Sequence, residues 1–137
     1  TGFQTLDVRK KEETITLIQQ IQPQVVINCA EGDYNDKVYE ACLATKTNVI
    51  DLGSDIKPTA EQLKFHEEFE KSEIIGITGC GSTPGINNVM LKYGAKDFDT
   101  IDTIEAGFAW DSNMKIFVPP FSMGSIIYEL VFPPLFS

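Results

Sequence analysis

Short apolar runs alternate with amphipathic stretches up to about residue 95. A short apolar run is typical of a parallel-sheet strand that is covered on both faces, and an apolar stripe at helical spacing is typical of a helix packed on one side. The predicted strands are residues 2–6, 24–29, 47–51 and 74–78. The predicted helices run from about residue 12 to Pro23 and over about 34–45, 59–71 and 86–95.

Strands that alternate with helices predict an α/β fold, here a partial Rossmann-like parallel sheet with helices on both faces and right-handed crossovers. The pattern changes near Lys96. Residues 103–110 and 114–118 then predict a hairpin, and Ser122 predicts the cap of a last helix over 123–131. We therefore expect the C-terminal part of a Rossmann-like domain over 1–96 and the start of an α+β substrate or dimerisation domain over 97–137.

Two helices carry further local signals. Thr59 with Gln62 three residues later predicts an N-terminal cap and a capping box. The helix over 34–45 has four small or branched apolar residues at inward spacing: Val38, Ala41, Cys42 and Ala44.

The composition limits the partners. The chain of 137 residues has a formal net charge of −9, and an acidic protein lacks the basic face that nucleic acids or anionic membranes need. Its three cysteines are an odd number at spacings that fit no disulfide framework, so we expect reduced thiols in a cytoplasmic protein. No apolar run has the length of a membrane span, and the N-terminus has no signal-peptide core.

The carboxyl ends of the predicted strands meet at one edge of a parallel sheet, where ligands bind in open α/β folds. Each strand end carries a polar or glycine feature: Asp7, Cys29-Ala30-Glu31, Asp51-Leu52-Gly53 and Gly79–Gly85. For any single position a plain turn is the simpler explanation, because Asp and Gly favour turns. The set as a whole favours a ligand-binding edge.

These residue types indicate which ligand the edge accepts. Asp7 and Asp51 are placed to bind a ribose or adenine, with helix capping as the alternative for Asp7 and a turn for Asp51. The glycine turn allows close approach of a flat ring or an oxyanion. The helix that begins at Ile86 is expected to offer free backbone N–H groups and a partial positive charge, which together favour phosphate.

The cysteines and the single histidine do not form a convincing site. A zinc site needs more ligands than Cys29 and Cys80 supply, and nothing orients His66 toward a cysteine, so we predict no metal and no Cys–His catalysis. We expect the cysteines to be small buried residues and His66 to lie on a helix surface.

The ordered set of segments resembles the saccharopine dehydrogenase-like oxidoreductases, including the lysine 6-dehydrogenase branch. The matching segments are Leu6-Asp7-Val8, the VVIN strand at 25–28, the helix segment 38–42, the strand 49–51 ending in Asp51, the turn from Gly81 through Pro84-Gly85 to Asn88, and the segments 107–110 and 120–122. The resemblance covers nearly the whole chain.

The resemblance implies an NAD(P)-dependent oxidoreductase that acts on an amino or imino acid. By this resemblance the residues near NAD or NADP are Asp7, Val8, Cys29, Ala30, Glu31, Asp51, Gly81, Pro84 and Gly85. Ser82, Thr83 and Asn87 would line the substrate cleft, and no catalytic acid or base is identified. Asp51 is the residue we would mutate first.

One family feature is missing: the G-x-G-x-x-G phosphate fingerprint, which is expected upstream of Thr1. We therefore expect the chain to be a fragment that is inactive alone and self-associates through an open edge of the strand 24–29 and its apolar C-terminal segment. The alternatives are a non-catalytic binding or assembly module with the same fold, or a relative with other chemistry, such as a reductase or a synthase that joins an amine to an aldehyde.

Overall fold

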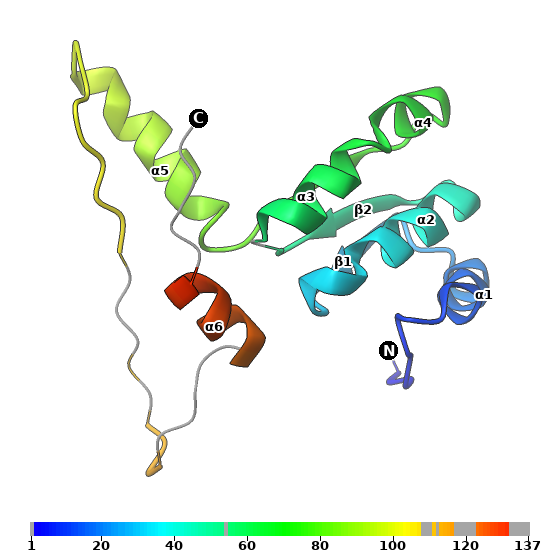
Figure 1. Cartoon of the computed structure of the whole chain (residues 1–137). Coiled ribbons are helices and arrows are strands. Elements are labelled where there is room, and N and C mark those ends of the chain that lie inside the picture. Colours follow the sequence, from blue (N-terminus) through cyan, green and yellow to red (C-terminus); the bar gives the residue numbers. More distant parts are fainter. Residues whose placement is uncertain (1, 54, 108–110, 112, 117–122, 132–137) are drawn as a thin grey trace. The chain divides into compact units, whose positions relative to one another are not determined.

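The computed structural model describes residues 2–53, 55–107, 111, 113–116 and 123–131. Contacts divide the chain into an N-terminal unit, Thr1–Asp102, and a C-terminal unit, Thr103–Ser137. The strands assigned among the described residues all lie in the N-terminal unit, where they alternate with helices (Figure 1). The predicted α/β class is therefore confirmed.

The sheet has three parallel strands in the order β1-β2-β3. They are β1 (Val25–Asn28), β2 (Asn48–Asp51) and β3 (Gly76–Ile77). The register pairs Val26 with Val49 and Asn28 with Asp51. The last residues of β1 and β2 therefore lie side by side at the carboxyl edge.

The helices follow the predicted alternation closely. In chain order they are α1 (Lys11–Ile21), the 3-10 turn η1 (Gly32–Tyr34), α2 (Asn35–Thr45), α3 (Ile56–Leu63), α4 (His66–Lys71), α5 (Ile86–Gly94), the 3-10 turn η2 (Ala95–Asp97) and α6 (Met123–Val131). α1 ends where predicted: Gln22 adopts a left-handed conformation and donates its N–H to Ile18 O, and Pro23 then prevents continuation.

One face of the sheet packs on helices to form the core. The buried apolar residues come from α1, α2, β2 and α4: Ile18, Val38, Tyr39, Ala41, Cys42, Val49 and Phe69. The rings of Tyr39 and Phe69 lie 5.6 Å apart between centroids, a separation typical of stabilising aromatic pairs. Gly76 passes directly beneath them, because a Cβ there would lie 3.0 Å from the Phe69 ring and 3.1 Å from the Tyr39 ring.

The opposite face of the sheet is open among the described residues. Val25 and Ile27 of β1 are 40% and 62% exposed, and Ile75 and Ile77 at β3 are 63% and 44% exposed. The second covering layer that the sequence predicts for β1 is thus not supplied by the part of the chain that the structure describes.

Two predicted elements of the N-terminal unit, and the cap predicted for one of them, are wrong. Residues 2–6 form no strand, because a strand needs a hydrogen-bonded neighbour and β1 pairs only with β2 in the described sheet. The predicted helix over 59–71 is two helices, and its N-cap is Asp55 rather than Thr59. Thr59 lies inside α3, where its hydroxyl donates to Asp55 O. Pro58 fits the first turn of α3, because an amide there has no partner within the helix.

The predicted inward face of α2 is confirmed at Val38, Ala41 and Cys42, but Ala44 is exposed. Ala44 lies in the last turn of α2, which ends at the left-handed Lys46.

The C-terminal unit contains the predicted helix as α6. The described parts of the predicted hairpin, 103–107, 111 and 113–116, contain no strand, so that prediction is wrong for these residues. Ser122 and the segment 132–137 lie outside the described residues. Within the described residues no helix has the length and hydropathy needed to cross a membrane.

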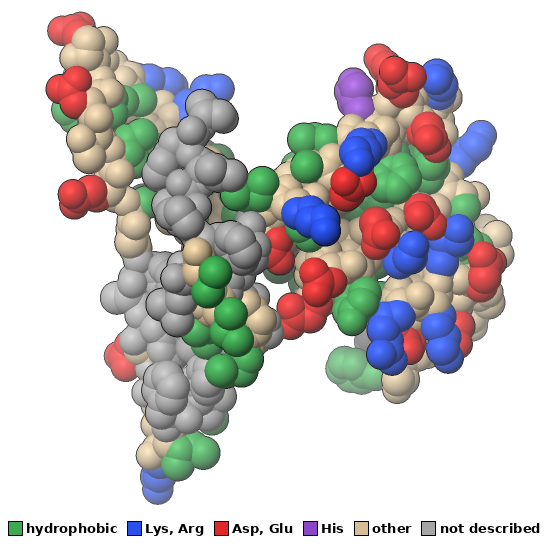
Figure 2. All heavy atoms as spheres, in the orientation of Figure 1, with side chains coloured by type: hydrophobic (Ala, Val, Ile, Leu, Met, Phe, Trp, Pro, Cys, Tyr) green, Lys and Arg blue, Asp and Glu red, His purple; other side chains and the backbone are tan. Residues whose placement is uncertain are grey.

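Charged side chains of both signs are interspersed on the visible face of the N-terminal unit (Figure 2). Close ion pairs in this unit, such as Lys10–Glu13 and Lys11–Glu40, bring opposite charges together. The face shown therefore presents no continuous basic surface.

Candidate functional site

The carboxyl edge of the sheet joins three of the predicted ligand loops. Cys29 and Ala30 follow β1, Leu52 and Gly53 follow β2, and the turn Gly79–Gly85 follows β3. Cys29, Ala30 and Leu52 are exposed there. The predicted convergence of these loops follows from the parallel order and register of the strands.

The buried side chain of Asp51 bonds to the backbone of two of these loops, the one after β2 and the one after β3. It is 1% exposed, and its Oδ1 accepts hydrogen bonds from Gly53 N at 2.8 Å and Gly79 N at 3.2 Å. Its Oδ2 accepts from Tyr39 OH at 2.8 Å and Gln62 Nε2 at 2.6 Å. A carboxylate has about four lone-pair sites, so this one is fully used within the protein. The structure therefore places Asp51 beneath the edge rather than at its surface.

The environment of Asp51 also affects Tyr39. Burial raises the pKa of the Tyr39 hydroxyl, and the hydrogen bond to the Asp51 carboxylate raises this pKa further. Tyr39 thus stays a neutral donor over the ordinary pH range, which suits a structural bond better than proton transfer.

The turn Gly79–Gly85 is built from glycines at positions without space for a side chain. Gly79 and Gly85 have φ angles of 64° and 128°. A Cβ on Gly85 would lie 2.1 Å from Gly81 O, and one on Gly81 would lie 3.1 Å from Leu52 O. Cys80 N donates to Asp51 O at 2.7 Å, which fixes the turn against β2. The turn therefore presents bare backbone beside the loop that follows β2.

The start of α5 does not offer the free amides that the sequence predicts. Gly85 N donates to Asn88 Oδ1, Ile86 N to Gly81 O and Asn87 N to Ser82 O. The prediction of a ready phosphate site here is wrong, because the tight turn folds its own acceptors back onto these donors. The geometry suits a flat group lying against backbone better than an anion.

The predicted substrate-cleft residues lie together on this turn. Ser82 and Thr83 are exposed, and Pro84 and Asn87 are half-buried. Asn87 Nδ2 donates to Thr83 Oγ1 at 2.6 Å, which holds the threonine hydroxyl over the first turn of α5. The structure thus brings Ser82, Thr83 and Asn87 together with Gly81, Pro84 and Gly85.

The loop after β1 carries an acidic neighbourhood. Glu31 is exposed, and a Cβ on Gly32 would lie 3.2 Å from Asp55 Oδ2, so this loop passes next to Asp55. Burial raises the pKa of Asp55, and the nearby Asp33 and Glu31 raise it further. This side of the edge therefore carries a negative electrostatic potential.

Asp7 and Val8 have other partners. Asp7 forms a two-pronged ion pair with Arg9, with 2.8 Å between each pair of atoms, and this hydrogen bonding lowers the pKa of Asp7 to about 2. The alternative of a helix cap does not hold, because Lys10 is the N-cap of α1. Val8 is half-buried and packs against the core.

The expectation of buried cysteines holds only for Cys42. Burial raises the pKa of the Cys42 thiol to about 12, whereas Cys29 and Cys80 are exposed at strand ends. All three thiols are free. His66 is exposed at the start of α4, as predicted for a helix surface.

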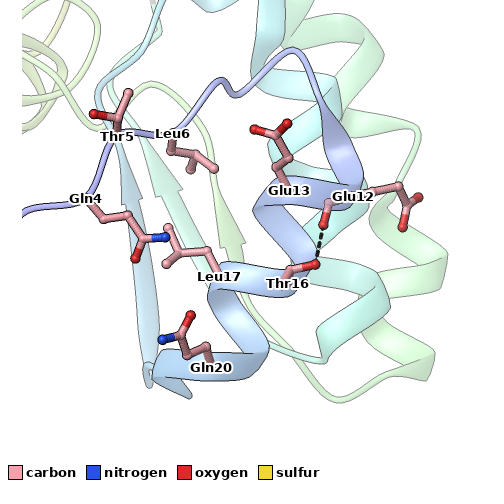
Figure 3. Close-up of a pocket in the computed structure, with 8 residues that line it drawn as sticks. All are labelled: Gln4, Thr5, Leu6, Glu12, Glu13, Thr16, Leu17 and Gln20. Carbon is pink, nitrogen blue, oxygen red and sulfur yellow. Dashed lines mark hydrogen bonds between the residues drawn. The ribbon is translucent and has the colours of Figure 1, made fainter.

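Two pockets lie outside the glycine turn, and the second includes Tyr39 and Gln62, the two side chains that bond Asp51 Oδ2. One, of about 400 Å³, lies between the segment Gln4–Leu6 and α1 (Figure 3), where Thr16 Oγ1 donates to Glu12 O. The other, of about 350 Å³, lies along α3, α4 and β3 and is lined by His66, Phe65 and Ile74 among others. Neither is lined by residues of the glycine turn 79–85.

Sequence reasoning missed four polar residues that support the edge: Asn28, Asn35, Tyr39 and Gln62. All are buried and hydrogen-bonded to one another or to Asp51. The available signal was the polar residue Asn28 at the end of an apolar strand, because a buried amide needs buried partners.

Comparison with known proteins identifies similar proteins but no matching family model. The chain is 32% identical over 105 residues to a carboxynorspermidine synthase of Vibrio alginolyticus, covering 69% of this chain and 25% of that protein. It is 30% identical over 105 residues to the carboxynorspermidine synthase of Vibrio cholerae, with the same coverage. It is 26% identical over 107 residues to a carboxyaminopropylagmatine dehydrogenase of Synechocystis, covering 73% of this chain and 27% of that protein. The chain spans about a quarter of the length of these curated relatives.

Proposed function

We propose that this chain is part of an NAD(P)-dependent oxidoreductase that acts on an amino compound of the carboxylated polyamine type. The observation that carries the proposal is the similarity to two carboxynorspermidine synthases, which extends over 69% of this chain. The relative named as a dehydrogenase of carboxyaminopropylagmatine points to the same class of compound. The parallel sheet supports the proposal, because open α/β sheets bind ligands at their carboxyl edge.

The names of these relatives point to a reaction class. A carboxylated polyamine contains a secondary amine, which can be made from a primary amine and an aldehyde. Their condensation releases water and gives an imine, and a hydride on the imine carbon with a proton on nitrogen gives the secondary amine. When bound, a nicotinamide cofactor would supply that hydride, or accept it in the reverse direction. We therefore propose the reductive joining of an amine and an aldehyde, or the reverse oxidation.

The residues of this chain would form one wall of the cleft. Gly81 and Gly85 leave bare backbone against which a flat nicotinamide ring can lie, and Ser82 and Thr83 offer exposed hydroxyls beside it. The amides at the start of α5 are already bonded, so the pyrophosphate would be held by other residues. Cys29 and Ala30 would border the cofactor from the loop after β1, which is separated from the glycine turn by β2.

The saccharopine dehydrogenase-like assignment is the finer alternative within the same oxidoreductase class. It rests on the ordered segments from Asp7 to the turn Gly81–Asn88. It predicts an amino acid such as lysine or saccharopine as the substrate, instead of a diamine with an aldehyde. The two readings differ in substrate but share the cofactor and the carboxyl edge.

The test uses the full-length protein with NADH and NADPH in separate assays. A diamine and an aldehyde that bears a carboxylate are added together, and loss of reduced-nicotinamide absorbance is followed, with each reactant omitted in turn. We expect oxidation of the cofactor only when both are present. Reduction of NAD⁺ or NADP⁺ to NADH or NADPH with saccharopine or lysine alone, in a parallel assay of the reverse direction, would favour the finer alternative. Failure to bind either cofactor would overturn the proposal in favour of a non-catalytic module.

A further inference from the structure

The buried amides and Asp51 form a single chain of hydrogen bonds that runs beneath the carboxyl edge. Ala30 N donates to Asn28 Oδ1 at 3.2 Å, and Asn28 Nδ2 donates to Asn35 Oδ1 at 2.7 Å. Asn35 Nδ2 donates to Gln62 Oε1 at 3.3 Å, and Gln62 Nε2 donates to Asp51 Oδ2 at 2.6 Å. We call Asn28, Asn35, Gln62 and Asp51 the amide relay.

The relay has one permitted direction. At one end a backbone N–H can only donate, so Asn28 must present its oxygen to Ala30. At the other end an ionised carboxylate can only accept, so Gln62 must present its nitrogen to Asp51. Each side-chain amide has one donating and one accepting side, so the two ends fix the orientations of all three amides: Asn28, Asn35 and Gln62.

The relay touches the loops that follow all three strands. It begins at Ala30 after β1, and Asp51 Oδ1 receives Gly53 N after β2 and Gly79 N after β3. Its four side chains are at most 6% exposed. Gly53 also leaves room for it, because a Cβ there would lie 2.6 Å from Asn35 Nδ2.

We propose that the amide relay positions the three loops of the cofactor-binding edge as one unit, so that Asn28, Asn35, Gln62 and Asp51 are positioning residues rather than ligand contacts. This inference rests on the proposed function, because it takes these loops to contact a dinucleotide. A buried polar network that is fully paired is rigid, and a network with one mismatched junction is costly. Loops held in fixed relative positions can contact a planar ring and the adjoining parts of the same ligand at the same time.

The direction of the relay gives a sharp test. Asn28→Asp replaces the amide nitrogen that faces Asn35 with an acceptor, so that acceptors flank the Asn35–Gln62 pair on both sides. Asp51→Asn turns a donor toward Gln62, so that donors flank the same pair on both sides. Each single change therefore leaves one junction at which two donors or two acceptors face each other. The double variant exchanges the ends: the introduced carboxylate still accepts from Ala30 N, and the introduced amide still accepts from Gly53 N and Gly79 N. Asn35 and Gln62 can then both flip, and Tyr39 can turn its hydroxyl to accept. The double variant also keeps the wild-type net charge.

The experiment measures the KM for NAD(P)H and kcat in the full-length protein, together with Tm. We expect each single variant to raise the cofactor KM about tenfold or more, and the double variant to recover most of that loss. Gln19→Glu, the same type of change on an exposed position of α1, should leave the KM unchanged. If the fold-increase in cofactor KM of the double variant equals the product of the two single-variant increases, the relay is overturned. Single variants that lower Tm without raising the KM would overturn its positioning role.

A second variant covers the case in which the single changes prevent folding. Gln62→Met cuts the relay in the middle and leaves Asp51 with three donors. We expect faster amide hydrogen exchange in the loop at Ala30, which Gln62 does not touch, and a raised cofactor KM. Unchanged exchange at that loop would refute coupling through the relay. A wild-type protein that binds no NAD(P)H would instead refute the proposed function, and the two failures are therefore distinguishable.

Discussion

Gly85 has a backbone conformation, with φ of 128°, that residues with a side chain rarely adopt. A Cβ at this position would also lie 2.1 Å from Gly81 O, so alanine requires the turn to move. Gly85→Ala is therefore expected to destabilise the protein by more than the roughly 1–3 kcal/mol of backbone strain alone. Urea unfolding of the intact protein measures this loss.

Gly94, the last residue of α5, is the matched control. Nothing lies within 4 Å of a Cβ built there, and its φ is not positive. Gly94→Ala should therefore leave stability unchanged or raise it by up to about 1 kcal/mol through helix propensity. Equal losses for both substitutions would show that the turn is not the constrained element.

The Asp7–Arg9 pair makes a prediction about pH. Arg9 lowers the pKa of Asp7 from 3.8 to about 2, so the pair stabilises the fold above about pH 3.8, and this contribution is lost as the pH falls toward 2. Arg9→Gln should return the pKa of Asp7 toward 3.8. An NMR titration of the Asp7 carboxyl carbon measures it, with Lys37→Gln as a control that leaves this pKa unchanged. An Asp7 pKa that stays near 2 without Arg9 would contradict the assignment.

At the scale of elements, α1 shows how one helix face contributes to the core. Ile18 is 6% exposed and packs in the core cluster, whereas Ile21 in the same helix is 62% exposed. Ile18→Ala should lower the free energy of unfolding by about 2–5 kcal/mol, because it removes buried methyl groups and leaves a cavity. Ile21→Ala should change it by no more than about 0.5 kcal/mol. Denaturant unfolding of both variants provides the comparison, and similar losses would mean that α1 is not oriented as described.

The same elements show what periodicity predicts well. β1, β2, α2 and α5 lie close to their predicted positions, because apolar runs and amphipathic spacing report burial directly. Residues 2–6 form no strand, because a strand depends on a partner that local sequence does not reveal. The break between α3 and α4 could not be predicted in this way, because no glycine or proline lies at it.

The candidate site was less predictable for a physical reason. The glycine turn could be recognised, because glycine marks special backbone geometry. Asp51 was recognised as important, but its burial and its four donors depend on Tyr39 and Gln62, which lie on other elements. Gln62 carries no local sign of burial, and the capping role that its spacing predicts is replaced by the bond to Asp51. Polar networks inside a core join residues far apart in sequence, so periodicity cannot detect them.

For the whole molecule, the open face of the sheet and the free edge of β1 lead to a prediction about association. Val25 and Ile27 of β1 are exposed, and within the described sheet β1 pairs with β2 alone. Exposed apolar strands at a sheet edge recruit further strands. Residues 1–137 expressed alone are therefore expected to self-associate as their concentration rises, which size-exclusion chromatography with light scattering measures directly.

Charge placed on the strand tests whether β1 is responsible. Ile27→Lys should shift the chain toward monomer, because a lysine on an edge strand opposes both pairing and stacking of sheets. Gln19→Lys adds the same charge at an exposed position of α1 and should leave the association unchanged. Circular dichroism confirms that both variants keep their helices. A wild-type chain that stays monomeric at high concentration would contradict the prediction, and equal effects of the two lysines would place the contact elsewhere than β1.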